Sequence, residues 1–240
     1  MMAFVHSKNG RILVNEKHVS AALNSYTVTR ERNLSEVTAY SDDGQRFIPG
    51  LRSGSLSLGG LFDSGTGNLD EEMESVFSGG DNGLLATVYP NGATVGAKGF
   101  LTTADVSNYT ISSAVADAVS VSIESSPDES IHSGVSLHDL SAETATGSGT
   151  AVDNGASTSG GGVAHLHVTA ASGASPSLTA KVQDSADNVT FVDLITFDAA
   201  TAADSQSKTV TGTVDQYVRA DWTISGTTPS FTFNVAFSRS

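Results

Sequence analysis

The chain has 240 residues, a formal net charge of −14 and no cysteine. This length is enough for two domains, each with its own core. The missing cysteine excludes disulfides and thiolate metal sites, and the negative charge argues against a protein that grips nucleic acid by its phosphates. We find no signal-peptide-like apolar run at the beginning and no stretch of about 18 apolar residues, so we expect no membrane span.

In the first half, short stretches with alternating or continuous apolar residues predict strands. Residues 26–29 alternate, and the run Leu84–Tyr89 is apolar throughout and is followed by the turn signal Pro90-Asn91-Gly92. Two further stretches place their apolar side chains on one face: Leu56, Leu58, Gly60 and Phe62, then Val119, Val121 and Ile123.

One helix is predicted between two of these strands. Asn68 is a suitable N-cap and Glu71 completes a capping-box pattern, while Gly79 and Gly80 form a stop signal. Acidic residues in the first turns suit the helix dipole. The side chains expected to pack the helix against a sheet share one face: Leu69, Met73, Val76 and Phe77.

In the second half, four longer stretches alternate with period two, and each predicts a strand with one buried face and one wet face. They cover residues 164–170, 178–182, 218–224 and 231–238. Turn signals separate them, so we predict a compact antiparallel β-sandwich. Trp222 lies in register with Val218 and Ile224, which favours a core position over a sugar-stacking platform.

The composition changes near Ser136, where a polar stretch ends and glutamate becomes rare. We therefore predict two domains, residues 1–135 and 136–240. The Gly/Ser-rich run 146–162 is interpreted as a loop near the start of the second domain, with a linker as the alternative. The fold class is thus mainly β: a β-sandwich or barrel with one short helix, followed by an antiparallel β-sandwich.

Residues that could carry chemistry have simpler structural interpretations. His165 and His167 point to one face of a strand and could begin a zinc site, but solvated histidines on a wet face are favoured. Asp42-Asp43-Gly44 lacks the rest of a calcium loop and is interpreted as a turn. We find no nucleophile elbow and no pair with a reason to be a catalytic dyad, so we expect no enzyme, no metal and no cofactor.

One segment is more specific. It reads Gly50-Leu51-Arg52-Ser53-Gly54-Ser55-Leu56-Ser57-Leu58-Gly59-Gly60-Leu61-Phe62-Asp63 and lies between a polar loop and the predicted helix. This order of loop, Gly-Leu, Ser/Leu strand, Gly-x-Phe-Asp and helix resembles the major tail (tail tube) proteins of long-tailed bacteriophages. The second half resembles, more loosely, the immunoglobulin-like or jelly-roll modules appended to virion proteins.

The resemblance implies a structural virion protein whose hexameric rings stack into a tube through which DNA passes without specific binding. Its implied partners are further copies of itself and other tail proteins (tape measure, terminator and distal tail), with no membrane. Its implied place is the virion tail, after assembly in the host cytoplasm. A virion decoration protein or carbohydrate-binding adhesin is the alternative, and a hydrolase would be a third class.

The resemblance also implies that the loop 39–50 contacts the neighbouring ring. In that loop Asp42, Asp43 and Arg46 would make polar contacts, while Phe47 and Ile48 would be apolar anchors. Alternatively, Phe47 and Ile48 begin the next strand and pack inside their own subunit. Residues 1–135 carry 8 basic and 16 acidic side chains, so we expect a bore lined mainly by Asp and Glu, or else acidic residues outside that serve solubility.

Overall fold

The computed structural model describes residues 7–63, 65, 68–79 and 83–240. The protein is mainly β, as predicted, with one α-helix in the described part of the chain. The elements are η1 (Ser7–Asn9), β1 (Arg11–Val14), β2 (Lys17–His18), β3 (Leu23–Glu36), β4 (Phe47–Leu61), α1 (Leu69–Gly79), β5 (Leu84–Tyr89), β6 (Lys98–Ser112), β7 (Ser120–Pro127), β8 (His132–Glu143), β9 (Gly147–Ser148), β10 (Val152–Asp153), β11 (Gly162–Ser185), β12 (Val192–Thr196), β13 (Asp204–Val210) and β14 (Tyr217–Arg239).

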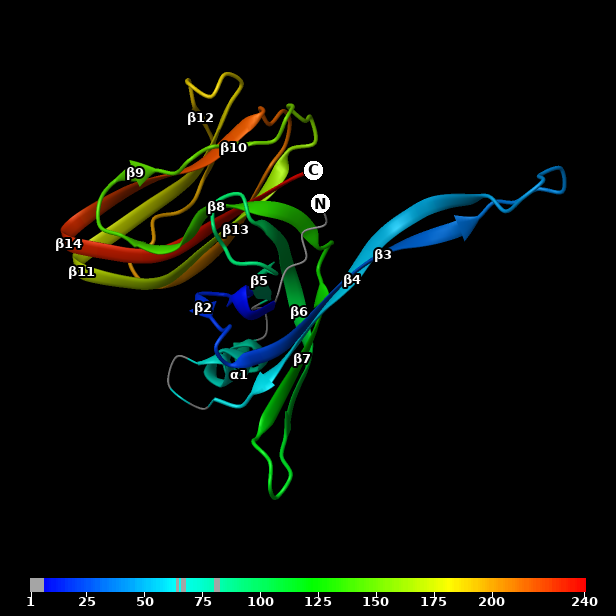
Figure 1. Ribbon diagram of the computed structural model, residues 1–240, viewed down its shortest axis with the longest axis horizontal. Helices are drawn as coiled ribbons and strands as arrows, with labels where there is room; N and C mark the ends of the chain where they lie inside the picture. The colour runs from blue at the N-terminus through cyan, green and yellow to red at the C-terminus, as the bar shows by residue number, and fades with distance from the viewer. Residues whose placement is uncertain (1–6, 64, 66–67, 80–82) are drawn as a thin grey trace.

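The strands are joined by hydrogen bonds into one branched network (Figure 1). Its main path is β12-β11-β14-β8-β6-β5-β1-β2. A branch leaves this path at β6, where residues 104–112 pair with β7, and β4 and β3 follow β7 in turn. All the registered strand pairs are antiparallel. The first half of the chain therefore holds a four-stranded sheet in the order β3-β4-β7-β6, and the second half holds the long strands β11 and β14.

Helix α1 covers one face of the four-stranded sheet. Leu69 and Met73 are buried, and Val76 packs against the same cluster, which includes Leu56 and Ile123. Phe77 was expected on this face but is 52% exposed. It lies roughly 80° around the helix from Leu69, since each residue turns the helix by about 100°. The apolar stripe therefore stops short of Phe77. The helix ends at Gly79, and Gly80 lies outside the described residues.

The second half forms a sandwich because β11 and β14 bend sharply near their middles. Both ends of β11 contribute to one core, since Leu166 and Leu178 are both fully buried in the same cluster. The bend coincides with irregular register around residues 168–177 and with positive φ at Gly173 and Gly226. Bulges and glycines allow such corners. Trp222 is in this core, as predicted, with 6% of its surface exposed.

Strand β5 joins the two halves, because both of its faces are buried. Leu84, Ala86 and Val88 pack on the α1 side, while Thr87 and Tyr89 point toward β11 and β14.

Strand β8 also spans the junction, since it begins at residue 132, pairs first with β6 and then continues along β14. The predicted boundary near Ser136 thus falls inside β8. The Gly/Ser-rich run 146–162 contains β9 and β10, which pair with β14.

These positions predict different costs for two apolar substitutions on the same helix. Met73→Ala should lower the free energy of unfolding by about 2–5 kcal/mol, because it opens a cavity in a closed core. Phe77→Ala is the matched control and should stay within about 0.5 kcal/mol. Urea denaturation followed by circular dichroism measures both changes. An equal loss for the two variants would contradict the observed packing of α1.

Candidate assembly surfaces

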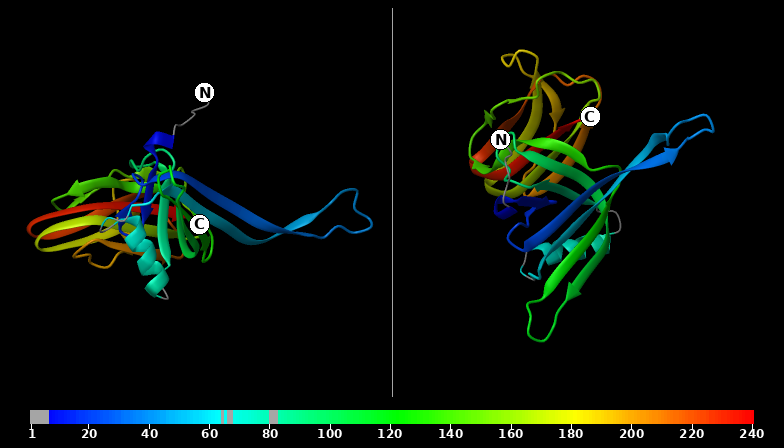
Figure 2. Two further views of the ribbon diagram at one scale, coloured as in Figure 1. Left: turned by 90° about the horizontal axis from the view of Figure 1, so that it is seen from below. Right: turned by 45° about the vertical axis from the view of Figure 1, so that its right-hand side comes forward.

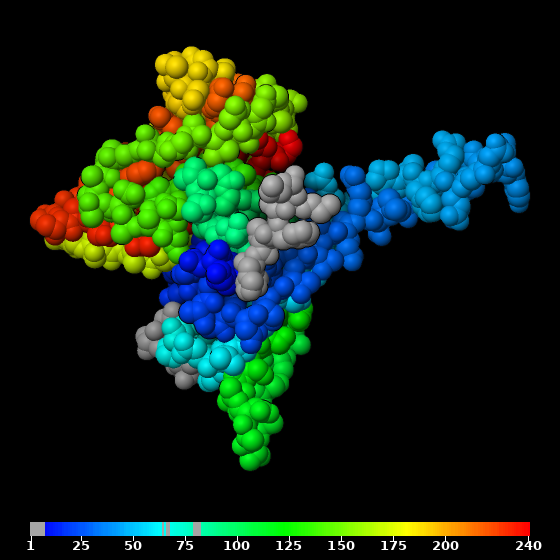
Figure 3. Space-filling view, viewed as in Figure 1, coloured from blue at the N-terminus to red at the C-terminus, as the bar shows by residue number. Residues whose placement is uncertain are grey.

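The largest projection of the molecule is a β-hairpin that we call the arm, residues 30–53. It is built from the outer parts of β3 and β4 and extends away from the body (Figures 1 and 2). Figure 3 shows that it stands free of the rest of the surface. Its exposed apolar side chains are Leu34, Val37, Tyr40, Phe47, Ile48 and Leu51. Apolar groups on an unsupported hairpin are typical of an interface rather than of a free surface.

The expected contact residues lie at the tip of the arm. Asp42 shapes the loop, because its carboxylate accepts a hydrogen bond from the Ala39 N–H at 2.8 Å and lies 3.4 Å from Arg46. Asp43 is exposed. Phe47 and Ile48 do begin the next strand, yet they are 48% and 53% exposed and do not pack in the core of their own subunit.

A second hairpin, formed by β6 and β7, projects from the opposite end of the four-stranded sheet (Figure 1). Its tip, residues 113–118, is exposed, and Val115 is fully exposed there. Sequence reasoning identified β7 but not this projection, because the tip carries no turn signal that distinguishes a short connection from a long hairpin.

The four-stranded sheet has two open edges. Strand β3 pairs only with β4 among the described strands, and residues 105–112 of β6 pair only with β7. Edge strands carry a row of unpaired N–H and C=O groups that can pair with another chain. Lone edges of this length are a liability for a monomer, and a second copy of the chain can satisfy them.

The face of this sheet opposite α1 is covered by no described element and is rich in hydroxyl groups. Strand register places the following side chains on it: Ser25, Thr27, Thr29, Glu31, Ser53, Ser55, Ser57, Leu61, Asp105, Asn108, Thr110, Ser112, Ser120, Ser122, Glu124 and Ser126. The charged members, Glu31, Asp105 and Glu124, are all acidic, and no Lys or Arg belongs to this set. We call this surface the open face.

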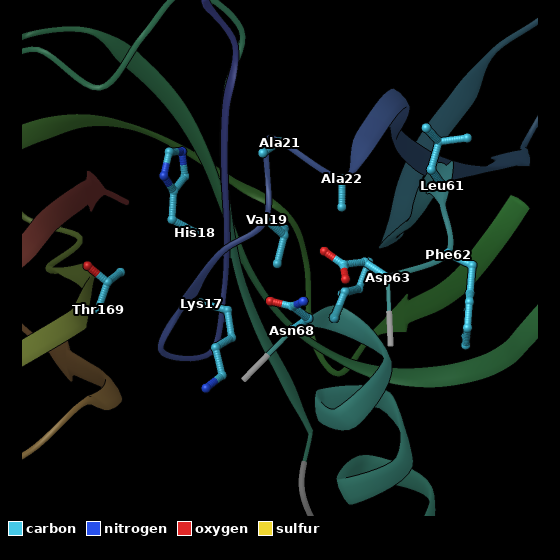
Figure 4. Close-up of a pocket in the computed structure, with 11 residues that line it drawn as sticks. Lys17, His18, Val19, Ala21, Ala22, Leu61, Phe62, Asp63, Asn68 and Thr169 are labelled. Carbon is cyan, nitrogen blue, oxygen red and sulfur yellow. The ribbon is translucent and has the colours of Figure 1, made fainter. Parts of the chain in front are cut away.

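A groove of about 550 Å³ lies beside the base of the sheet (Figure 4). Lys17 and His18 from β2 border it on one side, and Asp63 and Asn68 lie where β4 leads toward α1. Apolar side chains such as Phe62 line the remainder. Among the described residues that line the groove, no nucleophile is hydrogen-bonded to a base.

The histidines of β11 are not on a wet face, which corrects the expectation for His165 and His167. Both are buried, because β5 covers this face of β11. His167 Nδ1–H donates to the Asn15 carbonyl at 2.6 Å, which leaves Nε2 to accept the Thr87 hydroxyl proton at 2.8 Å. Thr87 Oγ1 then accepts from His165 Nδ1 at 3.0 Å.

The same junction contains a second buried polar chain. The Tyr89 hydroxyl donates to Asn234 Oδ1 at 2.8 Å, and Asn234 Nδ2 donates to the carbonyl of His138 at 2.5 Å. Ser136 donates to the carbonyl of Ala93 at 2.7 Å. Buried polar groups with partners of this kind fix how two layers fit together. Among the described residues, no group of three or more His, Asp or Glu side chains could hold a metal ion.

Comparisons with known proteins find partial and distant likenesses. No family model and no curated protein matches the sequence. The virion of a native gene transfer agent particle aligns with 53% of this chain and 97% of its own, at 15% identity and a TM-score of 0.46. A chain of the SPP1 tail tube aligns with 52% of this chain over 78% of its own length, at 12% sequence identity and a TM-score of 0.41. A chain of the anti-feeding prophage baseplate aligns with 55% of this chain over 97% of its own length, at 12% sequence identity and a TM-score of 0.44.

Two negative findings accompany these likenesses. No helix in the described part of the chain is long and apolar enough to cross a membrane. The sugar-platform alternative for Trp222 is not supported, because its ring is buried in the core and its Nε1–H donates to the Ala145 carbonyl at 3.0 Å.

The buried histidines predict a loss of stability in mild acid. Burial lowers the pKa of His167 to about 4, and burial together with the neighbouring His167 holds the pKa of His165 well below its usual range. Between pH 6.5 and 4 the unfolded chain binds these protons more readily, so the free energy of unfolding falls as the pH falls. His167 alone should account for roughly 2 kcal/mol between pH 7 and 5.

Urea denaturation at pH 7 and pH 5 measures this effect. The double variant His165→Gln with His167→Gln keeps amide groups for Thr87 and should flatten the dependence on pH. An unchanged dependence in that variant would assign the acid response to other groups.

Proposed function

We propose that this protein is the structural subunit of a phage tail tube, in which hexameric rings stack end to end. The observation that carries the proposal is the four-stranded sheet with an open edge on each side, because that geometry lets identical copies join without limit around a ring. The resemblance of residues 50–63 to tail tube proteins supports the same assignment.

The strand directions suit such a ring. Three antiparallel pairings connect β3, β4, β7 and β6, so β6 runs antiparallel to β3. A rotation about the ring axis keeps the direction of β3 in the next copy. Strand β6 of one copy then meets β3 of the next in the antiparallel sense, and the alternation continues around a closed barrel that has no edges.

The open face would line the bore of this barrel, because α1 and the second half occupy the other side of the sheet. Its hydroxyl groups are neutral and its charges are negative. Such a wall repels phosphates and provides no cation for DNA to bind. The bore would therefore be lined mainly by Ser and Thr side chains together with Glu31, Asp105 and Glu124, rather than mainly by Asp and Glu as expected from the sequence.

The arm would connect stacked rings. It extends well beyond the sheet from which it grows, and its apolar side chains are exposed. We propose that Phe47 and Ile48 bind the adjacent ring, with Asp42 and Arg46 shaping the tip and Asp43 making a polar contact. At the ends of the tube, the same surfaces would meet the tape measure, terminator and distal tail proteins.

The second half would form the outer decoration of the tube. Residues 136–240, together with the start of β8, lie on the side of the body away from the arm (Figure 1). Their polar junction with β5 holds them in one orientation. In this proposal the protein assembles in the host cytoplasm and resides in the virion tail.

The arm can be tested by charge introduction. Phe47→Asp with Ile48→Asp should leave a folded protein that forms no tubes, because losing an apolar anchor commonly costs 2 kcal/mol or more at an interface. The matched control is Val189→Asp with Val192→Asp, which introduces the same charge at exposed apolar side chains of the second half. Negative-stain microscopy and circular dichroism measure assembly and folding. Tubes from the arm variant, or their loss in the control, would contradict the role of the arm.

The bore can be tested on assembled tubes. Wild-type tubes should not retain labelled DNA at low salt, whereas Thr110→Lys with Ser122→Lys should create salt-sensitive retention, because these neighbours lie on the open face. Thr190→Lys with Thr213→Lys adds the same charge to exposed positions of the second half and should have much less effect. A tube structure with the open face on the outside would overturn the proposal.

A further inference from the structure

An arginine cluster lies at the base of the arm. Arg30, Arg32 and Arg52 line a hollow of about 380 Å³ together with Glu31, Ser53, Ser130 and Ile131. Arg32 and Arg52 are directly opposite each other in neighbouring strands, an arrangement in which like charges repel. Within the described residues no ion pair joins these arginines to a carboxylate. In a chain of net charge −14, such a cluster fits an anionic partner.

The helix α1 has the complementary charge. Its first turn contains Asp70, Glu71 and Glu72, and no basic residue lies in its last turn. The Tyr109 hydroxyl of β6 donates to Asp70 Oδ1 at 2.7 Å, which ties the helix to this strand. Glu74 is exposed and follows Asp70 by four residues, so the two carboxylates lie on the same side of the helix.

The cluster and the helix lie on the same side of the sheet. Arg30 is opposite Gly54, and Val28 is opposite Leu56, the residue that packs in the α1 core. Side chains alternate along a strand, so the three arginines share the α1 face. The helix lies over β6, whose open edge is the one that β3 of the next copy would meet.

We propose that Arg30, Arg32 and Arg52 of one copy bind the carboxylates of Asp70 and Glu74 on α1 of the next copy in the ring. This inference rests on the proposed edge pairing between β6 and β3. The contact relieves the repulsion between Arg32 and Arg52 and gives each ring interface a fixed partner and direction. Ring assembly is then weakened by salt, because the pairs lie at a solvent-accessible junction.

A charge exchange between the two surfaces tests the contact. Arg52→Glu should raise the protein concentration needed for half assembly at least about tenfold, because it places Glu against Glu74. Adding Glu74→Arg in the same chain should restore assembly, since every interface then carries the exchanged pair. The control is Arg52→Glu with Asp139→Arg, which makes the same charge change at an exposed position of the second half. Light scattering, microscopy and circular dichroism provide the readouts.

The outcomes separate the two proposals. Restoration by Glu74→Arg but not by Asp139→Arg supports the contact. If Arg52→Glu assembles like the wild type, or if both second substitutions restore it equally, the contact is refuted while the ring remains. If the wild-type protein stays monomeric at high concentration, the proposed function fails as well. A variant that does not fold is replaced by Arg30→Glu, tested against the same partners.

Discussion

The structure depends on the burial of β5 on both faces. One face carries Leu84, Ala86 and Val88 into the core under α1, and the other carries Thr87 and Tyr89 into the junction with β11 and β14. A strand in this position cannot slip, because a shift of one residue would exchange the apolar and hydrogen-bonding faces. The four-stranded sheet and the sandwich are therefore held at one angle to each other. Whatever the first half assembles into, the second half is held in a fixed position beside it.

Sequence periodicity predicted the strands but not the layer that covers them. The alternation at residues 164–170 correctly separated Leu166 from His165 and His167, yet both faces are buried. Polar side chains on a covered face look the same in sequence as polar side chains in water. The mostly apolar run of β5, in which Thr87 is the polar exception, was the available signal, because such runs are typical of strands buried on both faces. It indicated a second layer without identifying the histidine face as its partner.

The assembly surfaces show the opposite difficulty. Phe47 and Ile48 were recognised as unusual for a loop, and they lie in the arm, but their exposure could not be derived from their identity. An apolar residue in a strand predicts burial, and only the isolation of the hairpin shows that no part of the subunit provides it. Phe77 illustrates a smaller error of the same kind: a residue at the margin of a helical stripe is buried only if the sheet extends far enough to reach it.

Charge limits how these copies can associate. With a net charge of −14 on each chain, the proposed ring would accumulate electrostatic repulsion between its copies. In that ring, association would come from groups that gain by pairing: the backbone edges of β3 and β6, the apolar arm, and a local exception to the acidic surface. Arg30, Arg32 and Arg52 are that exception, placed on the α1 side of the sheet, while the set of side chains on the open face contains no Lys or Arg. In the proposed ring, positive charge would be available where copies meet and withheld from the surface that a polyanion would pass. This division would let one sheet promote assembly on one face and avoid DNA on the other.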